Sequence, residues 1–325
     1  HNYTIGYDLL AMGDLESRTM ALDHFSRWYG FSGEPLKEMY KNSAITSGGI
    51  RGMHDIMQSL IDRALNAGTL HRFVHPDNSF GTYFPCIEAG ADRDDSAHRR
   101  EFFKLTTKAE SKLHLDEHDV EKFYSEHEPS DYESWYLTPV GNPSGTAMTP
   151  AQLENTVAAI VKHNPKAIVF VDSVYVRTLK EEVAQTIYKG IVENEELLNR
   201  CIFLESFSKS HGLCGERIGC YFTSNPQIFT DCHQHTIAFS AGSGRHRDYQ
   251  VAALASMPEQ HLKGVSELHE FWRMERKGLL NFLMQEDYED LFEREQAHID
   301  PADYDSPCGL YVTLLVKPGD RKSVV

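Results

Sequence analysis

Short apolar runs rich in β-branched and aromatic residues alternate along the chain with longer segments of helical periodicity. Residues 50–68 place apolar side chains at helical spacing and end in glycine, which predicts an amphipathic helix. Residues 149–165 predict a second helix, with Thr149 as its N-cap and Pro150 at its first position. The predicted strands cover residues 69–76, 134–140, 167–176, 201–208 and 219–224.

Strands that alternate with helices are typical of an α/β fold, in which helices cover both faces of a mostly parallel, mixed sheet. Ligands of such sheets bind beyond the carboxyl ends of the strands. We therefore expect the functional residues in the turns that follow Val140, Val171 and Phe207.

The pattern changes beyond this predicted α/β region. A long charged helix, residues 260–285, precedes one final strand, residues 309–316. This change predicts a second, smaller α+β domain. We expect a large domain over residues 35–255 and a small domain built from residues 1–34 and 256–325.

The composition is that of an ordinary soluble globular protein, with 41% hydrophobic and 25% charged residues among 325. A net charge of −16 argues against nucleic acid and against an anionic membrane as partners. The six cysteines form no CxxC pair and no His/Cys cluster at zinc spacing, so no metal site is expected. No apolar run is long enough to span a bilayer and no signal peptide is recognised, so we expect a cytoplasmic protein.

The segment "ESFSKSHGLCGERIG", from Glu205 to Gly219, is the most informative part of the sequence. Lys209 follows a predicted strand, lies among serines, and is followed eight positions later by Arg217. An isolated lysine is ordinarily a solvated surface group. Hydroxyls, glycines and a guanidinium instead form an anion site, and a lysine beside fixed positive charge loses its proton more easily. Such a lysine becomes a nucleophile for aldehydes.

Three further segments are weaker when each is taken alone. Asp172 ends an apolar strand three residues before Tyr175, and it is either a turn former or an anion placed against a protonated pyridine ring. Residues 141–145 form a tight polar turn after a strand, which is also consistent with a plain loop. Residues 47–49 open a helix and fit a phosphate cradle, although glycine-rich turns before helices are common.

These segments occur in the order and approximate spacing of the fold-type I enzymes of pyridoxal 5'-phosphate (PLP). "NPSG", "DSVY" and "SFSKSHGLCGERIG" resemble the signature segments of the aspartate aminotransferase (class I/II) family. The resemblance implies a PLP transferase fold and an aminotransferase that acts through a Lys209 Schiff base. It implies that Asp172 pairs with the pyridine nitrogen, and that Tyr175 and Asn142 bind the phenolic oxygen. Lys209, Asp172 and Tyr175 are thus the expected catalytic residues.

The resemblance also assigns the remaining cofactor contacts. Ser206, Arg217 and the backbone of residues 47–49 are expected to bind the phosphate, with Ser208 helping. The phosphate cradle at the start of the helix comprises Ser47, Gly48 and Gly49. The segment "PDNSFGTY" matches the region that supplies the ring-stacking aromatic side chain, for which Phe80 is expected and Tyr83 is the alternative.

Two implications concern the ends of the chain. Family active sites lie at a subunit interface, so we expect a homodimer with shared sites, to which Tyr7 or Tyr3 contributes a phosphate contact from the neighbouring subunit. The family's substrate-carboxylate arginine cannot be assigned, because Arg321 lies too close to the last predicted strand. We therefore expect the small domain to be incomplete at its C-terminus.

Other outcomes of the same chemistry remain open at this point. Fold-type I decarboxylases, lyases and cyclases share every cofactor residue named above. A non-catalytic PLP-binding regulator is a further alternative, although such proteins usually carry a DNA-binding segment and nothing basic or helix-turn-helix-like precedes His1 in this sequence. We expect a transaminase whose substrates are an amino acid and a 2-oxo acid.

Overall fold

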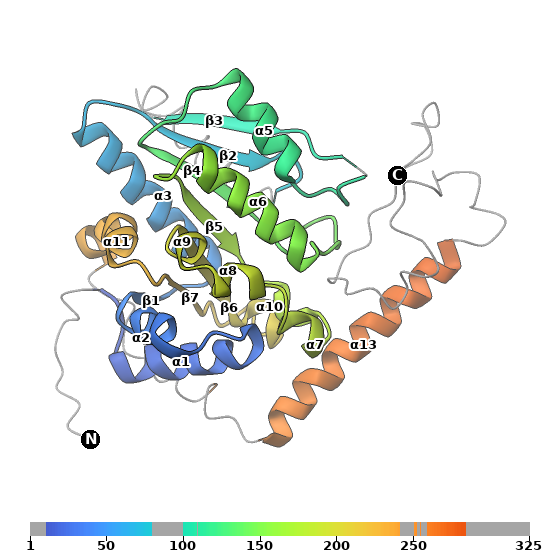
Figure 1. Cartoon of the computed structure of the whole chain (residues 1–325). Coiled ribbons are helices and arrows are strands. Elements are labelled where there is room, and N and C mark those ends of the chain that lie inside the picture. Colours follow the sequence, from blue (N-terminus) through green and yellow to red (C-terminus); the bar gives the residue numbers. More distant parts are fainter. Residues whose placement is uncertain are drawn as a thin grey trace.

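The structure is a computed structural model that describes residues 11–79, 100–108, 110–240, 250, 251, 254 and 259–283 of the chain (Figure 1). Several residues singled out above lie outside this part: Tyr3, Tyr7, Phe80, Tyr83, Arg321 and the predicted strand 309–316. The division into two domains therefore stays a prediction. Among the described residues, no helix is both long and apolar enough to cross a membrane.

A seven-stranded mixed sheet organises the described part of the chain, in the order β1-β7-β6-β5-β4-β2-β3. The strands are β1 (Ser43–Thr46), β2 (His71–Pro76), β3 (Arg100–Leu105), β4 (Glu133–Leu137), β5 (Ile168–Asp172), β6 (Cys201–Ser206) and β7 (Gly219–Phe222). β7 runs antiparallel to both of its neighbours, whereas β2 to β6 pair in parallel with one another. The expected α/β class with a mostly parallel, mixed sheet is confirmed.

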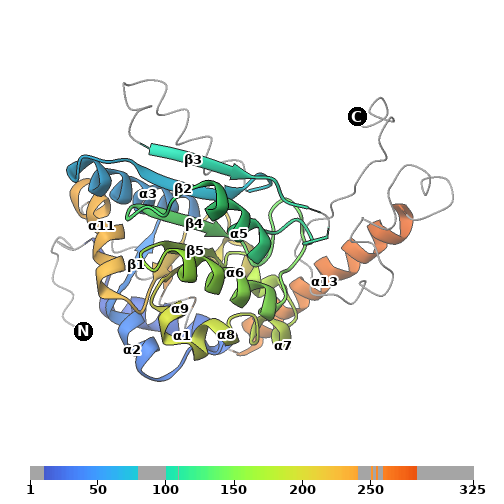
Figure 2. The same cartoon turned by 45° about the horizontal axis from the view of Figure 1, so that its top comes forward.

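Helices cover both faces of this sheet, as Figures 1 and 2 show. The described α-helices are α1 (Leu15–Tyr29), α2 (Gly33–Lys41), α3 (Gly49–Asn66), α5 (Glu117–Glu126), α6 (Pro150–His163), α7 (Glu181–Ala184), α8 (Lys189–Glu193), α9 (Glu195–Leu198), α10 (Phe207–Ser210), α11 (Pro226–Ser240) and α13 (Glu259–Leu283), of which α13 lies to one side of the sheet (Figure 1). α3 and α11 pack on one face of the sheet, and α5 and α6 on the other (Figure 2).

Alternation of side chains along each strand explains why both faces are apolar. In β5, Val169 and Val171 enter the core cluster on the α6 face, whereas Ile168 and Phe170 enter the cluster on the α3 face. All four side chains are at most 3% exposed. A strand buried on both faces reads as a continuous apolar run, and this is the pattern that predicted the strand.

Two boundaries clarify how the sequence encodes the fold. The helix N-cap predicted at Thr149 is confirmed, because its side chain accepts a hydrogen bond from the Gln152 backbone N–H. The strand predicted over residues 201–208 is too long, since β6 ends at Ser206 and the next residues form α10. The Ser206 hydroxyl accepts the backbone N–H of Ser208, which is an N-cap that turns the chain from strand to helix.

Aromatic side chains from distant parts of the sequence fill the core beside β6. Phe31 lies 5.0 Å from Phe203 and 5.9 Å from Tyr188 between ring centroids, and Phe203 lies 5.5 Å from Phe222. Tyr29, at the end of α1, packs edge-on against Tyr188 at 5.1 Å. The N-terminal helix α1 therefore shares one hydrophobic core with the sheet.

A carboxyl group is buried within this aromatic core. Glu205 in β6 is completely buried; its carboxylate accepts hydrogen bonds from the Tyr29 hydroxyl and, at 3.1 Å, from the Ser206 N–H. Burial, which disfavours the charged form, raises the pKa of Glu205 from 4.5 to about 8 against the opposing effects of the Tyr29 bond and the Arg177 charge. Glu205 is therefore mostly protonated at neutral pH.

Removal of a ring from the aromatic core should be costly. Phe203→Ala is expected to lower the free energy of unfolding by about 3–5 kcal/mol, because a fully buried ring leaves a cavity between packed neighbours. Phe271→Ala is the matched control, since that ring is 55% exposed on α13. Urea denaturation of both variants measures the difference, and equal losses would contradict the assigned core.

The buried acid should make stability depend on pH in a defined direction. A carboxyl whose pKa is raised by folding holds its proton more tightly in the folded state, so its contribution to stability falls as pH rises from about 4.5 to about 8. Glu205→Gln does not titrate, and the Tyr29 hydroxyl is able to accept a hydrogen bond from the new amide. The free energy of unfolding of wild type minus that of the variant should decrease across this window and level off above it. A difference that is independent of pH would refute the raised pKa.

Candidate active site

A cavity of about 120 Å³ lies where β5 and β6 end and α3 begins. Its position follows from the topology, because the carboxyl ends of parallel strands meet at one edge of a sheet. The cavity is lined by Gly49, Ile50, Asn142, Asp172, Val174, Tyr175, Ser206, Ser208, Lys209, Cys214 and Arg217.

Lys209 reaches this cavity from α10, the single helical turn that follows β6. Two serines fix the turn: the Ser206 hydroxyl donates to the Ser208 hydroxyl at 2.8 Å, and the Ser210 hydroxyl donates to the Ser206 carbonyl at 3.1 Å. The Lys209 Nζ lies 5.6 Å from the centre of the Tyr175 ring. The amine therefore projects from a short, internally bonded turn, which gives it a defined position.

Asp172, the last residue of β5, is held by two hydrogen bonds. Its Oδ2 accepts from the Tyr136 hydroxyl at 2.5 Å, and its Oδ1 accepts from the Val174 N–H at 3.1 Å. The side chain is oriented at the edge of the cavity with only 6% of the residue exposed. Tyr136 was not predicted; it lies in β4 opposite Phe170, so only the register between β4 and β5 brings it to Asp172.

Tyr175 and Asn142 form a second pair on the cavity wall. The Asn142 side-chain amide donates to the Tyr175 hydroxyl at 3.2 Å, although the two residues are 33 positions apart. Tyr175 is 5% exposed. The pair thus presents one amide and one hydroxyl together beside Lys209 and Asp172.

The start of α3 packs closely against Arg217 and β7. Gly48 has a φ of 82°, and a Cβ at this position would lie 2.7 Å from Arg217 Nη2. A Cβ on Gly219 would lie 2.8 Å from the Gly48 carbonyl carbon and 2.9 Å from the Gly49 nitrogen. Glycine at 48 and 219 therefore lets the guanidinium and the backbone N–H groups of the helix start approach one another.

Arg217 itself adopts an uncommon backbone conformation. Its φ is 55°, in the left-handed region that side chains other than glycine rarely occupy. Its guanidinium contacts Gly48 and also donates a hydrogen bond from Nη1 to the Cys214 carbonyl at 3.0 Å. Strained residues of this kind are concentrated at ligand sites, where surrounding structure holds them in place.

Two buried histidines form hydrogen bonds with the turn that carries Lys209. Nε2 of His269, in α13, bonds the Ser210 carbonyl at 2.7 Å, and Nδ1 of His211 pairs with the Ser210 hydroxyl at 2.9 Å. Burial lowers the pKa of His211 to about 3 and that of His269 to about 4, and the nearby Arg177 charge adds to both shifts. Both rings are therefore neutral near pH 7 and act as fixed hydrogen-bond partners.

The structure brings most of the predicted site residues to one place. Eight of them line the cavity: Gly49, Asn142, Asp172, Tyr175, Ser206, Ser208, Lys209 and Arg217. Gly48 lies against Arg217, whereas Ser47 is not among the lining residues. Phe80 and its alternative Tyr83 lie outside the described residues. The lining residues that were not predicted are Ile50, Val174 and Cys214. Val174 and Cys214 lie within the signature segments, but the resemblance assigns no role to either residue.

Known proteins with similar sequences are aminotransferases. An aromatic amino acid aminotransferase of Mycobacteroides abscessus is 30% identical over 116 residues, which cover 36% of this chain and 30% of that protein. One from Nocardia farcinica is 32% identical over 120 residues, covering 37% and 31% respectively. The matched segment thus spans less than a third of the length of these relatives.

Solved structures extend the likeness to the fold. The aromatic aminotransferase from Pyrococcus horikoshii superposes with a TM-score of 0.65 at 18% identity, over 85% of this chain and 66% of that one. A variant of the Thermus thermophilus aspartate aminotransferase gives 0.67 at 15% identity, over 86% and 68%. At this identity the likeness establishes the fold, which is that of the fold-type I aminotransferases.

The family is established by a match that covers most of the chain. Residues 27–291 match the family described as aminotransferase class I and II. This range contains every described residue that lines the cavity. The protein belongs to the class I and II aminotransferases, a family of PLP-dependent enzymes.

Proposed function

We propose that the protein is a PLP-dependent transaminase that moves an amino group between an amino acid and a 2-oxo acid, with Lys209 as the residue that bonds the cofactor. The observation that carries this proposal is the meeting of Lys209, Asp172 and Tyr175 around one cavity at the strand ends. An amine, a carboxylate and a phenol in one partly buried site are the groups that PLP chemistry requires.

The chemistry of the donor set fits PLP. The start of α3, Arg217 and Ser206 offer backbone N–H groups, a guanidinium and a hydroxyl, which suit a phosphate dianion. The close approach of Gly48 to Arg217 leaves no room for a side chain there, as expected for a cradle built around a phosphate. The carboxylate of Asp172 suits a protonated ring nitrogen, and the amine of Lys209 suits an aldehyde.

Bound PLP supplies an aldehyde that reacts with amines and a ring that withdraws electrons from the substrate Cα. With PLP bound, Lys209 would hold the aldehyde through its Nζ, and the same amine would serve as the base for the Cα proton of the substrate. The Asp172 carboxylate, which the Tyr136 hydroxyl and the Val174 N–H keep in place, would keep the ring nitrogen protonated. Asn142 and Tyr175 would bind the phenolic oxygen.

The phosphate contacts are proposed to govern cofactor affinity. Arg217 binds as a planar fork, Ser206 adds a hydroxyl, and the backbone of residues 47–49 adds N–H groups, with Ser208 positioned by its bond to Ser206. Phe80, or Tyr83 in its place, is proposed as the ring-stacking residue. Together these residues would hold the cofactor in the cavity that Lys209 and Asp172 line.

The class of amino donor is proposed from the relatives. The curated relatives are named aromatic amino acid aminotransferases, so an aromatic L-amino acid is the first donor to test. A homodimer with shared sites is proposed with the enzyme. A cytoplasmic location is proposed as well; the described cysteines Cys201, Cys214, Cys220 and Cys232 are free thiols, which a reducing compartment maintains.

The bond to the cofactor is tested at Lys209. Borohydride reduction of the PLP-loaded protein should fix the cofactor to this lysine, which peptide mass spectrometry identifies. Lys209→Ala should still bind PLP without a covalent bond but lose turnover by several orders of magnitude, because one group serves as nucleophile and base. Lys189→Ala, which removes an exposed lysine, should behave as wild type. A label on another lysine would overturn the assignment.

The proposed phosphate contacts are tested at Arg217. Arg217→Ala should weaken PLP binding about 10- to 100-fold, because a charge-assisted contact contributes roughly 1.5–3 kcal/mol. Ser206→Ala removes a neutral hydroxyl and should weaken it less, while Arg217→Lys should restore only part of the affinity. Excess PLP should recover part of the activity of each variant. Titration by fluorescence gives the affinities, and an unchanged value for Arg217→Ala would mean that this residue does not face the phosphate.

A further inference from the structure

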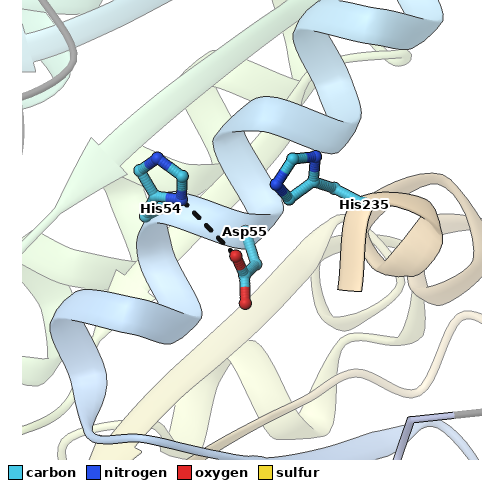
Figure 3. A group of neighbouring side chains, drawn as sticks. All are labelled: His54, Asp55 and His235. Atoms are coloured by element: carbon cyan, nitrogen blue, oxygen red, sulfur yellow. Dashed lines mark hydrogen bonds and ion pairs between the residues drawn. The ribbon is translucent and has the colours of Figure 1, made fainter. Parts of the chain in front are cut away.

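Three side chains of types that can ligate a metal ion lie close together where α3 meets α11. His54 and Asp55 are neighbours in α3, and His235 approaches them from α11 (Figure 3). One nitrogen or oxygen atom of each lies within 4.8 Å of the corresponding atoms of the other two. None of the three lines the active-site cavity, so this cluster, the α3–α11 cluster, has no part in the proposed transamination.

The separations are close to those that a metal ion imposes. Nδ1 of His54 lies 3.4 Å from Oδ1 of Asp55. Two ligands at about 2.0–2.1 Å from a tetrahedral ion are separated by roughly 3.4 Å, so this pair already has the spacing. Figure 3 shows a ring nitrogen of His235 directed towards the Asp55 carboxylate. The His235 ligand atom lies within 4.8 Å of the other two, so the three atoms are already gathered without an ion.

The backbone beneath the cluster is fixed by a buried hydroxyl. The Ser59 hydroxyl donates to the Asp55 carbonyl at 2.8 Å and accepts the backbone N–H of His235 at 2.8 Å. This relay joins the two helices at the residues that carry the ligands. The two bonds of the Ser59 hydroxyl thus fix the backbone of His235 relative to the backbone of Asp55.

The surrounding charges orient the ligands. Arg51 Nε donates to Oδ2 of Asp55 at 2.9 Å, which fixes the carboxylate and leaves Oδ1 directed to His54. Asp62 Oδ2 lies 3.8 Å from Nδ1 of His235 and places a second carboxylate beside the cluster. Carboxylates and hydrogen bonds in the second shell of this kind hold ligands in their binding orientation.

We propose that the α3–α11 cluster is a binding site for a divalent transition-metal ion of the Zn²⁺ class. Two imidazoles and one carboxylate are a ligand set that Zn²⁺ uses. Imidazole ligands favour Zn²⁺ over Mg²⁺ and Ca²⁺, which prefer oxygen ligands. The side chain of His54 is 44% exposed, so an ion can enter from solvent and keep water as its fourth ligand. The bound ion would join α3 to α11, and α3 begins at the active-site cavity.

Isothermal titration of Zn²⁺ into the PLP-loaded full chain tests the proposal. We expect one ion to bind at this site and to raise the thermal midpoint of unfolding, since an ion that binds only the folded state stabilises it. His54→Gln and His235→Gln should each weaken binding at least about tenfold and abolish the rise in the midpoint. Because His54 is half exposed, its variant should fold as wild type, as its midpoint without metal would verify.

The matched control is His163→Gln. Nε2 of His163 lies 2.7 Å from the Glu121 carboxylate, which gives an imidazole and an acid at the surface; among the described residues this pair belongs to no group of three metal-ligating side chains. This variant should bind Zn²⁺ with the affinity and midpoint shift of wild type. If His54→Gln and His235→Gln also bind like wild type, or if wild type binds no ion, the proposed site is wrong.

Discussion

The parallel pairing of β4, β5 and β6 is the constraint on which the site depends. Val169 pairs with Cys201 and Asp172 pairs with Leu204, so β5 and β6 end at the same edge of the sheet. This register places the Asp172 carboxylate beside the turn that carries Lys209, although the two are far apart in sequence. A slip of one residue would direct Asp172 to the other face of the sheet and separate the two groups.

Buried polar groups support the turn that carries Lys209 from both sides. Glu205 is bonded to Tyr29 and to the Ser206 N–H, so the residue before the Lys209 turn is fixed to the N-terminal helix. The neutral His211 and His269 hold Ser210 on the other side of Lys209. The turn is therefore anchored at both ends by buried hydrogen bonds, which are strong where water is excluded. The backbone that carries Lys209 is thus held in place on both sides.

The sequence was informative where local patterns carry the chemistry. The apolar run of β5, the N-cap at Thr149 and the Lys209 motif each depend on residues that are close along the chain, and each was predicted. Tyr136 was missed because its bond to Asp172 follows from strand register. β6 was predicted too long because the local cap, in which the Ser206 hydroxyl accepts the Ser208 N–H, was not recognised in the sequence. The spacing of histidines along the sequence likewise did not predict the α3–α11 cluster, because only the packing of α3 on α11 brings His54 and His235 together.

The central claim is that this arrangement transfers an amino group rather than releasing carbon dioxide or ammonia. The direct measurement is a single half-reaction: PLP-loaded protein is mixed with an aromatic L-amino acid without a 2-oxo acid acceptor, and the products are quantified. The account predicts one equivalent of the corresponding 2-oxo acid per active site, with the amino group retained by the protein until an acceptor is added. Release of carbon dioxide, or of free ammonia in step with the product, would contradict transamination and assign the site to another PLP reaction.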